Sequence, residues 1–315
     1  MAEPPLVSVV IPTYSRPAYL REAIASVLAQ DYEHWRIVVH DDAGSAANRA
    51  VAERFADARI AYRANPQRLG IGANKFAGWQ AAEGPYVANL DDDDLWEPHF
   101  LSTLVPVLEA DPSLVIAFGS HAIIDADGVV DRAATAANER RYRGGLAPGR
   151  HASLDRLALV DQAIPLTMGA VIRRSAVDWW DFPPETDVVA DFWLGYLLVR
   201  SGGGAFYEPR SLTRYRVHAD SATAAGGSAW HRSFAACYRR LLQDPQLAAL
   251  WPEFRARLGA YERRTAICHL KANEGPAARR SCRRALAAAV TPATLAVTAM
   301  SLSGPVGRRA VARLR

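Results

Sequence analysis

The sequence predicts an α/β fold in which helices flank a mainly parallel, Rossmann-like sheet, followed by a helical C-terminal appendage. Three observations carry this prediction. Residues 1–113 alternate β-branched runs with segments of helical periodicity, which is typical of β-α-β units. Carboxylates follow two of these runs directly. Past residue 229 only helical periodicity remains. We therefore expect an α/β region over 1–228 and a helical region over 229–315.

The first elements are expected in a regular order. They are the strand VSVVIP, a helix over 19–30, the strand WRIVVHDD, a helix over 47–55, the strand RIAYR, a helix over 72–82 and the strand YVANL, which ends in DDDD. Continuous apolar strands of this kind are typical of a sheet that is covered on both faces.

The pattern becomes mixed from residue 114. LVIAFG and the segment 168–172 are expected to be strands. The polar, arginine-rich segment 133–150 is expected to be a loop.

Composition bounds the class of protein. Of the 315 residues, 50% are hydrophobic and 22% charged, which is typical of a globular chain with a sizeable core. Cys237, Cys268 and Cys282 form no Cys-x-x-Cys pair, which argues against a disulfide framework and a thiolate zinc site. The first residues lack the pattern of a signal peptide. These features favour a cytoplasmic protein.

The positive charge is concentrated at the C-terminus. No acidic residue follows Glu274, whereas eight arginines do: Arg279, Arg280, Arg283, Arg284, Arg308, Arg309, Arg313 and Arg315. The charge-free segment 285–307 is broken by prolines and makes a poor membrane-spanning helix. This basic tail predicts either peripheral contact with the inner face of the cell membrane or a solvated helix face. Without a recognition motif, it does not indicate nucleic-acid binding.

Polar residues mark three strand ends: Pro12-Thr13-Tyr14, Asp41-Asp42 and the run Asp91 to Asp94. In open α/β sheets the ligand crevice lies beyond the carboxyl ends of the strands, so these residues are expected at one site. Four adjacent carboxylates require either solvent or a cation. Oxygen ligands favour Mg²⁺ or Mn²⁺. The alternative is an acidic turn that caps a helix starting near Trp96.

Three segments together resemble a known family. VSVVIPTYSRPAYLREAIASVLAQDY, IVVHDD and RLGIGANKFAGWQAAEGPYVANLDDDDLWEP are similar in order and spacing to the N-terminal half of family 2 glycosyltransferases of the GT-A fold. The resemblance implies a catalytic domain over 1–228, with a nucleotide-sugar-binding half (1–113) and an acceptor-side half (114–228).

The resemblance implies donor-binding roles at the first two strand ends. Pro12, Thr13 and Tyr14 would form the first donor loop, with the aromatic ring against the nucleotide base. Asp42 would accept a hydrogen bond from the base, and Asp41 would support the loop. An ordinary turn and a helix cap are the alternatives. The family's DDGS is DDAGS here, so the local backbone is expected to differ.

The resemblance also assigns the acidic run. Asp91 and Asp93 match the D-x-D motif, with Asp93 the main ligand of Mn²⁺ or Mg²⁺, and Asp92 would contact the ribose. Lys75 stands where the family often has a basic residue, and would either neutralise a donor phosphate or remain a solvated helix lysine.

Two downstream segments extend the match. VVADFWLGYLL resembles the segment that carries the general base, which maps to Asp191; the family's preceding glutamate is Ala190 here. RYRVHADSAT resembles a Y-R-x-H segment and places His218 near the metal or the diphosphate. The alternatives are a helix N-cap for Asp191 and a surface histidine for His218.

The predicted activity is an inverting transfer of sugar from a nucleoside-diphosphate donor, a UDP- or dTDP-sugar. The acceptor would be a hydroxyl of a glycan, a lipid-linked saccharide or a small molecule, in the synthesis of polysaccharide, O-antigen, cell-wall glycan or another glycoconjugate. Two alternatives stay open. A sugar-phosphate nucleotidyltransferase should carry a Gly-rich loop where PTYSRP stands. A silent sugar-nucleotide or glycan-binding scaffold would lack turnover despite its intact Asp191.

Overall fold

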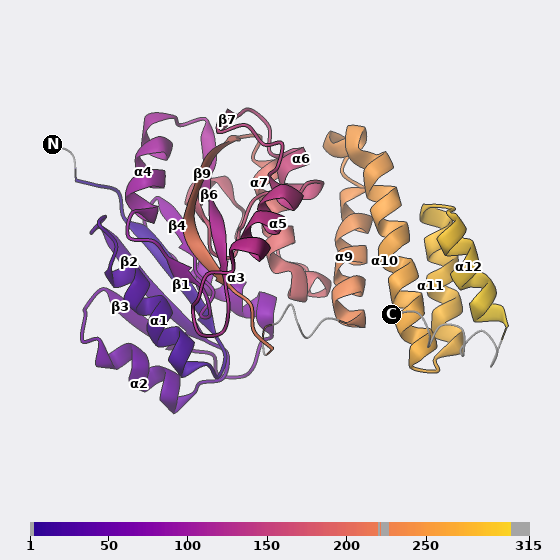
Figure 1. Ribbon diagram of the computed structural model, residues 1–315, viewed down its shortest axis with the longest axis horizontal. Helices are drawn as coiled ribbons and strands as arrows, with labels where there is room; N and C mark the ends of the chain where they lie inside the picture. The colour runs from indigo at the N-terminus through magenta and orange to yellow at the C-terminus, as the bar shows by residue number, and fades with distance from the viewer. Residues whose placement is uncertain (1–2, 220, 222–226, 304–315) are drawn as a thin grey trace. The chain divides into compact units, whose positions relative to one another are not determined.

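A computed structural model describes residues 3–219, 221 and 227–303 of the chain (Figure 1). The chain forms two compact units. The first comprises Met1–Phe182 and Ala190–Ala219, and the second Pro183–Val189 and Asp220–Arg315. The whole described sheet belongs to the first unit, and the second is helical. The predicted fold class is confirmed, including the C-terminal helices.

The sheet of the first unit has the strand order β3-β2-β1-β4-β8-β6-β9-β5, with β7 paired to β9. The strands are β1 (Val7–Thr13), β2 (Trp35–Asp41), β3 (Ile60–Ala64), β4 (Tyr86–Asn89), β5 (Leu95–Trp96), β6 (Leu114–Ile124), β7 (Gly149–His151), β8 (Ala170–Arg173) and β9 (Gly204–Arg216). The block β3-β2-β1-β4 is parallel, as is the pair β6–β9. The strands β8, β5 and β7 run antiparallel to their neighbours.

The helices of the first unit are α1 (Pro17–Leu28), α2 (Ala46–Arg54), α3 (Ile71–Gln80), α4 (Phe100–Ala110), α5 (Arg132–Tyr142), α6 (Asp155–Leu159) and α7 (Ala190–Arg200), with the 3-10 turn η1 (Arg174–Ala176). Those of the second unit are η2 (Pro184–Val189), α9 (Ser228–Leu241), η3 (Pro245–Leu250), α10 (Trp251–Lys271), α11 (Gly275–Ala288) and α12 (Pro292–Leu302). No described helix combines the length and the apolar character needed to cross a bilayer.

The alternating side chains of β1 show how the layers are built. Val7, Val9 and Ile11 pack into one core with apolar residues of α1 and α4. Val10 points to the opposite face, where it meets α3 at Gly78. Because both faces of the strand are covered, every β1 side chain is buried. This burial explains the continuous apolar run in the sequence.

Two local expectations are wrong. The segment 133–150, expected to be a loop, begins with helix α5, because Asp131 accepts a hydrogen bond from the Ala134 backbone N–H and alanines favour the helix that follows. Its arginines are compatible with this helix since α5 buries no residue. The helix expected near Trp96 begins at Phe100 instead, because Leu95–Trp96 pairs with β9 as strand β5.

The contact between α3 and β1 allows a test of this packing. A Cβ added at Gly78 would lie 2.6 Å from Val10 Cγ1, so one side must shift. We expect Gly78→Ala to lower the free energy of unfolding by about 1–2 kcal/mol, since overpacking of about 1–3 kcal/mol exceeds the gain in helix propensity. Denaturant unfolding measures the effect.

Two controls test whether the contact between residue 78 and Val10 causes the loss of stability. Gly145→Ala, at a glycine with open space around it, should be near neutral. The double variant Gly78→Ala/Val10→Ala should be less destabilised than the sum of its single variants. Strict additivity of the two substitutions would contradict the proposed contact.

Candidate active site

The three predicted strand ends meet at the carboxyl edge of the parallel block. Thr13 of β1 is the direct partner of Asp41 in β2. The Asp42 backbone N–H donates to the Thr13 carbonyl at 3.0 Å, and the Leu90 backbone N–H donates to the Val10 carbonyl at 3.0 Å. The acidic run after β4 therefore begins beside the end of β1, and Thr13 Oγ1 donates a 2.6 Å hydrogen bond to Asp92.

Asp41 holds the loop between β2 and α2. Its fully buried carboxylate accepts hydrogen bonds from the backbone N–H groups of Ala43 and Ser45, at 2.8 and 3.0 Å, and from the hydroxyl of Tyr62 at 2.6 Å. Burial and the hydrogen bond to Asp41 raise the pKa of the Tyr62 hydroxyl, which keeps it a donor. These contacts are what a loop-supporting role requires.

Asp42 faces a different loop. Its carboxylate accepts hydrogen bonds from the backbone N–H groups of Leu69 and Gly70, at 2.7 and 3.0 Å, and from the side chain of Asn65 at 3.0 Å. The helix-cap alternative is wrong for Asp42, because Ser45 caps α2 by accepting from the Asn48 backbone N–H. The carboxylate fixes the turn that leads into α3.

Each carboxylate of the acidic run has a polar partner, and Asp92 and Asp93 share one. Asp91 pairs with Lys75 of α3 at 2.8 Å. Asp92 pairs with Arg16 at 2.8 Å, and Asp93 contacts both Arg16 and His218.

The last carboxylate, Asp94, accepts from the Arg216 backbone N–H at 2.9 Å. Its Oδ2 is buried without a hydrogen-bond partner among the described residues. The expectation that the run might cap a helix is wrong, since β5 intervenes before α4.

The short strand β5 brings the end of β9 to this run. Leu95 pairs antiparallel with Arg214, so the segment that follows β9 returns beside Asp93 and Asp94. His218 Nε2 lies 3.0 Å from Asp93 Oδ2, and its side chain is only 5% exposed. The alternative of an exposed surface histidine is therefore wrong.

Burial is the main influence on the pKa of Asp91, Asp92 and Asp94, and it raises all three. Burial, followed by the charge of Asp93, raises the pKa of Asp94 well above its ordinary value. Burial also raises the pKa of Asp92 to about 7, although Arg16 opposes the shift. Carboxyl groups with raised pKa values occur where a fold holds like charges close together. Such groups are found most often at functional sites.

Lys75 is buried, so the solvated-lysine alternative is wrong. Burial by itself lowers its pKa, but the carboxylates of Asp91 and Asp191 outweigh that effect and raise it. Lys75 thus remains a cation and joins the acidic run to the predicted base. Asp191 lies inside the first turn of α7.

Two arginines of the site, Arg16 and Arg216, were not predicted from the sequence. The Arg16 guanidinium lies between Asp92 and Asp93, and its NH1 is 3.5 Å from His218 Nε2. Burial lowers the pKa of Arg16, but the charges of Asp92 and Asp93 raise it overall. The signal for Arg16 was its place in the PTYSRP loop, directly after a strand that ends at the site.

The second missed arginine is Arg216, the R of the Y-R-x-H segment. It is 2% exposed and donates to the carbonyls of Asp93 and Ala126, at 2.8 and 2.9 Å, and to the carboxylate of Glu22 at 2.6 Å. Its guanidinium also lies over the ring of Tyr19, 4.6 Å from the centroid. Arg216 therefore ties the acidic loop to α1 and to the loop after β6.

Tyr14 is the most exposed member of the predicted donor loop, at 42%. The Arg68 guanidinium lies over its ring, 4.3 Å from the centroid. Pro12 and Thr13, by contrast, are buried in β1. Within this loop the Tyr14 ring is therefore the group available to a flat ligand such as a base.

The fit of a divalent cation can be judged from the donor atoms. In the described part of the chain, no three His, Cys, Asp or Glu side chains lie close enough to hold a metal by themselves. Asp93 Oδ2 and His218 Nε2 are 3.0 Å apart. Neighbouring ligands of an octahedral ion with bonds of about 2.1 Å are separated by about 3 Å. These two residues thus fit a site that substrate phosphates would complete.

Comparison with known proteins identifies the family. The model of glycosyl transferase family 2 matches residues 8–178, more than half of the chain. The chain belongs to glycosyl transferase family 2. The matched segment contains the predicted donor loops and the acidic run.

Curated relatives match over part of their length. The chain is 34% identical over 107 residues to the "Putative colanic acid biosynthesis glycosyl transferase WcaA" of Escherichia coli K12. The aligned segment covers 33% of this chain and 38% of that protein. It is 28% identical over 127 residues to the E. coli UDP-Glc:α-D-GlcNAc-diphosphoundecaprenol β-1,3-glucosyltransferase WfgD, covering 40% and 50%. The chain therefore spans half or less of the length of these relatives.

Solved structures share the fold over nearly the whole chain. S. aureus TarS 1-349 in complex with UDP-GlcNAc has a TM-score of 0.66 at 14% identity, covering 97% of this chain and 87% of TarS 1-349. The mannosyltransferase PcManGT of Pyrobaculum calidifontis, solved with GDP-Man and Mn²⁺, has a TM-score of 0.56 at 18% identity, covering 98% and 84%. At these identities the likeness establishes the GT-A fold.

The contacts of Arg216 predict that even a conservative substitution at this position lowers the stability of the protein strongly. The three acceptors are bound by three separate guanidinium nitrogens, Nε, NH1 and NH2, and the single nitrogen of a lysine cannot occupy all three positions. We expect Arg216→Lys to lower the free energy of unfolding by about 2–3 kcal/mol, because the buried Asp93 carbonyl loses its donor and the contacts with Ala126 and Glu22 are weakened. The matched control is Arg214→Lys, on the same strand, where one partly exposed pair with Glu97 should contribute at most about 1 kcal/mol. Equal losses in the two variants would refute the bridging role.

Proposed function

We propose that the chain transfers a sugar from a nucleoside-diphosphate donor to a hydroxyl acceptor, with inversion at the anomeric carbon. The observation that carries this proposal is the meeting of the run Asp91 to Asp94 with Arg16, Lys75 and His218 at the carboxyl edge of the sheet. A site with paired carboxylates and nearby cations suits a diphosphate and its counter-ion. Family membership supports the same activity.

The nucleotide would lie along the ends of β1 and β2. Tyr14 offers an exposed ring for the base. The Asp42 carboxylate would accept a hydrogen bond from the base, beside the turn that it already orders. Asp92, which is fully buried against Thr13 and Arg16, would orient the ribose once Arg16 turns away from it. We propose UDP- and dTDP-sugars as donors, since uracil and thymine present a ring N–H to Asp42; guanine has a ring N–H as well, so GDP is included in the test.

Asp93 and His218 would hold Mn²⁺ or Mg²⁺ together with donor oxygens, with Asp91 beside them. The bound ion would stabilise charge on the departing diphosphate. Arg16 lies against both Asp93 and His218 in this structure. Its guanidinium would turn from the carboxylates to the diphosphate as the donor binds, because both present oxygens that it can bind in a bidentate manner.

Asp191 would act as the general base. A hydroxyl is a weak nucleophile, so a carboxylate must accept its proton as it attacks the anomeric carbon. The charge of Asp191, like that of Asp91, acts on the buried Lys75, so the proposed base lies near the acidic run. A single displacement at the anomeric carbon inverts its configuration.

The names of two relatives support a proposal for the acceptor class. WfgD and a Campylobacter jejuni β-1,3-glucosyltransferase, 38% identical over 104 residues, are named for substrates linked to diphosphoundecaprenol or PP-undecaprenol. We propose a saccharide acceptor of cell-surface glycan assembly, lipid-linked in the first instance. The protein would then work in the cytoplasm at the inner face of the membrane.

Donor and cation binding can be measured together by thermal unfolding. Ligand at about 100 times its dissociation constant should stabilise the protein by about 2.7 kcal/mol. We expect UDP or dTDP with Mn²⁺ to do so in the wild type and in the control Asp127→Ala, an exposed loop variant. Asp93→Ala should lose the Mn²⁺-dependent part. If none of UDP, dTDP and GDP stabilises the protein, the proposal of a nucleoside-diphosphate donor is wrong.

Substitution of Asp191 distinguishes an active glycosyltransferase from a catalytically silent scaffold. We expect Asp191→Asn to lower kcat by about 10²–10⁴-fold, since the lost group takes the proton in the transition state. Nucleotide stabilisation should stay unchanged. The assay measures sugar transfer to GlcNAc-diphosphoundecaprenol, with Asp178→Asn as a surface control and the anomeric configuration read by NMR. Turnover equal to wild type would exclude Asp191 as the base, and a product of retained configuration would exclude a single displacement.

A further inference from the structure

The second unit carries an unbalanced positive face. Four arginines lie on α11, and only Arg284 among them has a described ion pair, with Glu262 of α10 at 2.8 Å. Arg279, Arg280 and Arg283 are exposed and have no ion pair within the described part of the chain. The sequence supplies no acidic residue after Glu274 that could compensate them. This face therefore attracts anions.

Helix α12 has an unusual distribution of side chains. Its inward positions are Thr294, Val297 and Ser301, which are buried. Leu295 and Leu302 are 52% and 70% exposed. Since residues seven apart lie on one side of a helix, these leucines form one outward apolar stripe. A helix that only covered a small core would be expected to turn its leucines inward.

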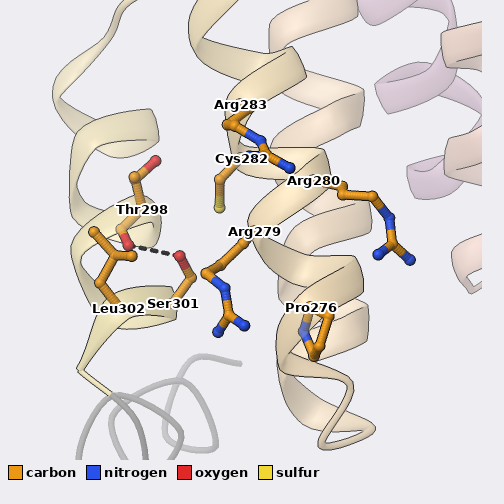
Figure 2. A pocket seen from close by; sticks show the side chains of 8 residues that line it. All are labelled: Pro276, Arg279, Arg280, Cys282, Arg283, Thr298, Ser301 and Leu302. Atoms are coloured by element: carbon orange, nitrogen blue, oxygen red, sulfur yellow. Dashed lines mark hydrogen bonds between the residues drawn. The ribbon is translucent and has the colours of Figure 1, made fainter.

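Three of the arginines and Leu302 border one hollow. Figure 2 shows this pocket of about 380 Å³ between α11 and α12. It is lined by Pro276, Arg279, Arg280, Cys282, Arg283, Thr298, Ser301 and Leu302. Exposed cations and an exposed leucine thus lie at the same opening. Neighbouring Arg and Leu side chains are typical of surfaces that lie in the interface of an anionic bilayer.

We propose that the α11–α12 face, defined by Arg279, Arg280, Arg283, Leu295 and Leu302, docks onto an anionic phospholipid bilayer. The guanidinium groups bind lipid phosphates by charge-assisted hydrogen bonds. The two leucines enter the boundary between headgroups and acyl chains. The contact is peripheral and reversible, because it combines a few charges with a small apolar area.

Other occupants fit this face less well. A free phosphate or a nucleic acid would bind the arginines but leave the leucines in water. A second copy of the same face would bring arginines against arginines with no acidic residue between them. The inference rests on the helical unit alone, so it stands or falls independently of the sugar-transfer reaction.

Vesicle co-sedimentation of the full chain tests the proposal. The probes are vesicles of phosphatidylcholine with and without phosphatidylglycerol. We expect binding only to the anionic vesicles, with affinity falling as NaCl is raised. The triple variant Arg279→Gln/Arg280→Gln/Arg283→Gln should bind on the order of a hundred-fold more weakly, from about five-fold for each arginine. The matched control Arg132→Gln/Arg140→Gln/Arg141→Gln removes the same charge from exposed positions of α5 and should lose far less.

A second variant tests the apolar part. Leu295→Gln/Leu302→Gln should weaken binding to anionic vesicles without changing the slope of its salt dependence, since no charge is altered. Circular dichroism and nucleotide-dependent stabilisation show that each variant is folded, which separates failure of docking from failure of the donor site.

Four outcomes would overturn the proposal. They are equal binding to neutral vesicles, an equal loss in the α5 control, release from vesicles by inorganic phosphate at constant ionic strength, and a change of molar mass in solution for the triple variant. The third outcome would indicate a site for free phosphate. The fourth would indicate self-association through this face.

Discussion

Four consecutive carboxylates are held together against their mutual repulsion, and the architecture of the first unit depends on how they are neutralised. Asp92 and Asp94 have almost no exposed surface. Burying an ionised carboxylate costs several kcal/mol even after relaxation, so nearby cations and donors are a requirement of the fold. Arg16 and Lys75 supply the cations, and Arg216 supplies donors. They come from three segments far apart in the chain.

The strand order is what brings these segments together. Because β1 lies between β2 and β4, the loop after β1 reaches both the Asp41–Asp42 loop and the acidic run. The pairing of β5 with β9 delivers Arg216 and His218 from the other end of the unit. Arg16, which belongs to the loop after β1, then contacts the groups delivered by both routes. The site is therefore a property of the whole sheet.

Much of this could be predicted from the sequence, because buried parallel strands and acidic strand ends leave local signals. The order of the first elements and the carboxyl-edge site belong to this class, whereas the expectation that His218 lies near the metal or the diphosphate came only from the resemblance to the family. The supporting partners could not be predicted. Arg16 in the PTYSRP loop and Arg216 in the Y-R-x-H segment stand next to predicted site residues, but nothing local identifies their partners, which lie more than seventy residues away in the chain. Helix α5 was missed because its arginines resemble a loop, while its Asp131 cap and its alanines carry the helix signal.

The small side chains of the second unit have a consequence for local stability. The core that joins α10, α11 and α12 consists of Ala266, Leu270, Ala278, Cys282 and Val297, with Ile267 and Met300 at its margin. Such a core buries far less apolar area per helix than the valine- and leucine-rich layers around β1. Local opening has the lowest free energy where few apolar contacts must be broken. Helix α12 is therefore expected to exchange its amide hydrogens well before the strands of the sheet, so the surface that carries the exposed arginines and leucines is also the less rigid part of the described chain.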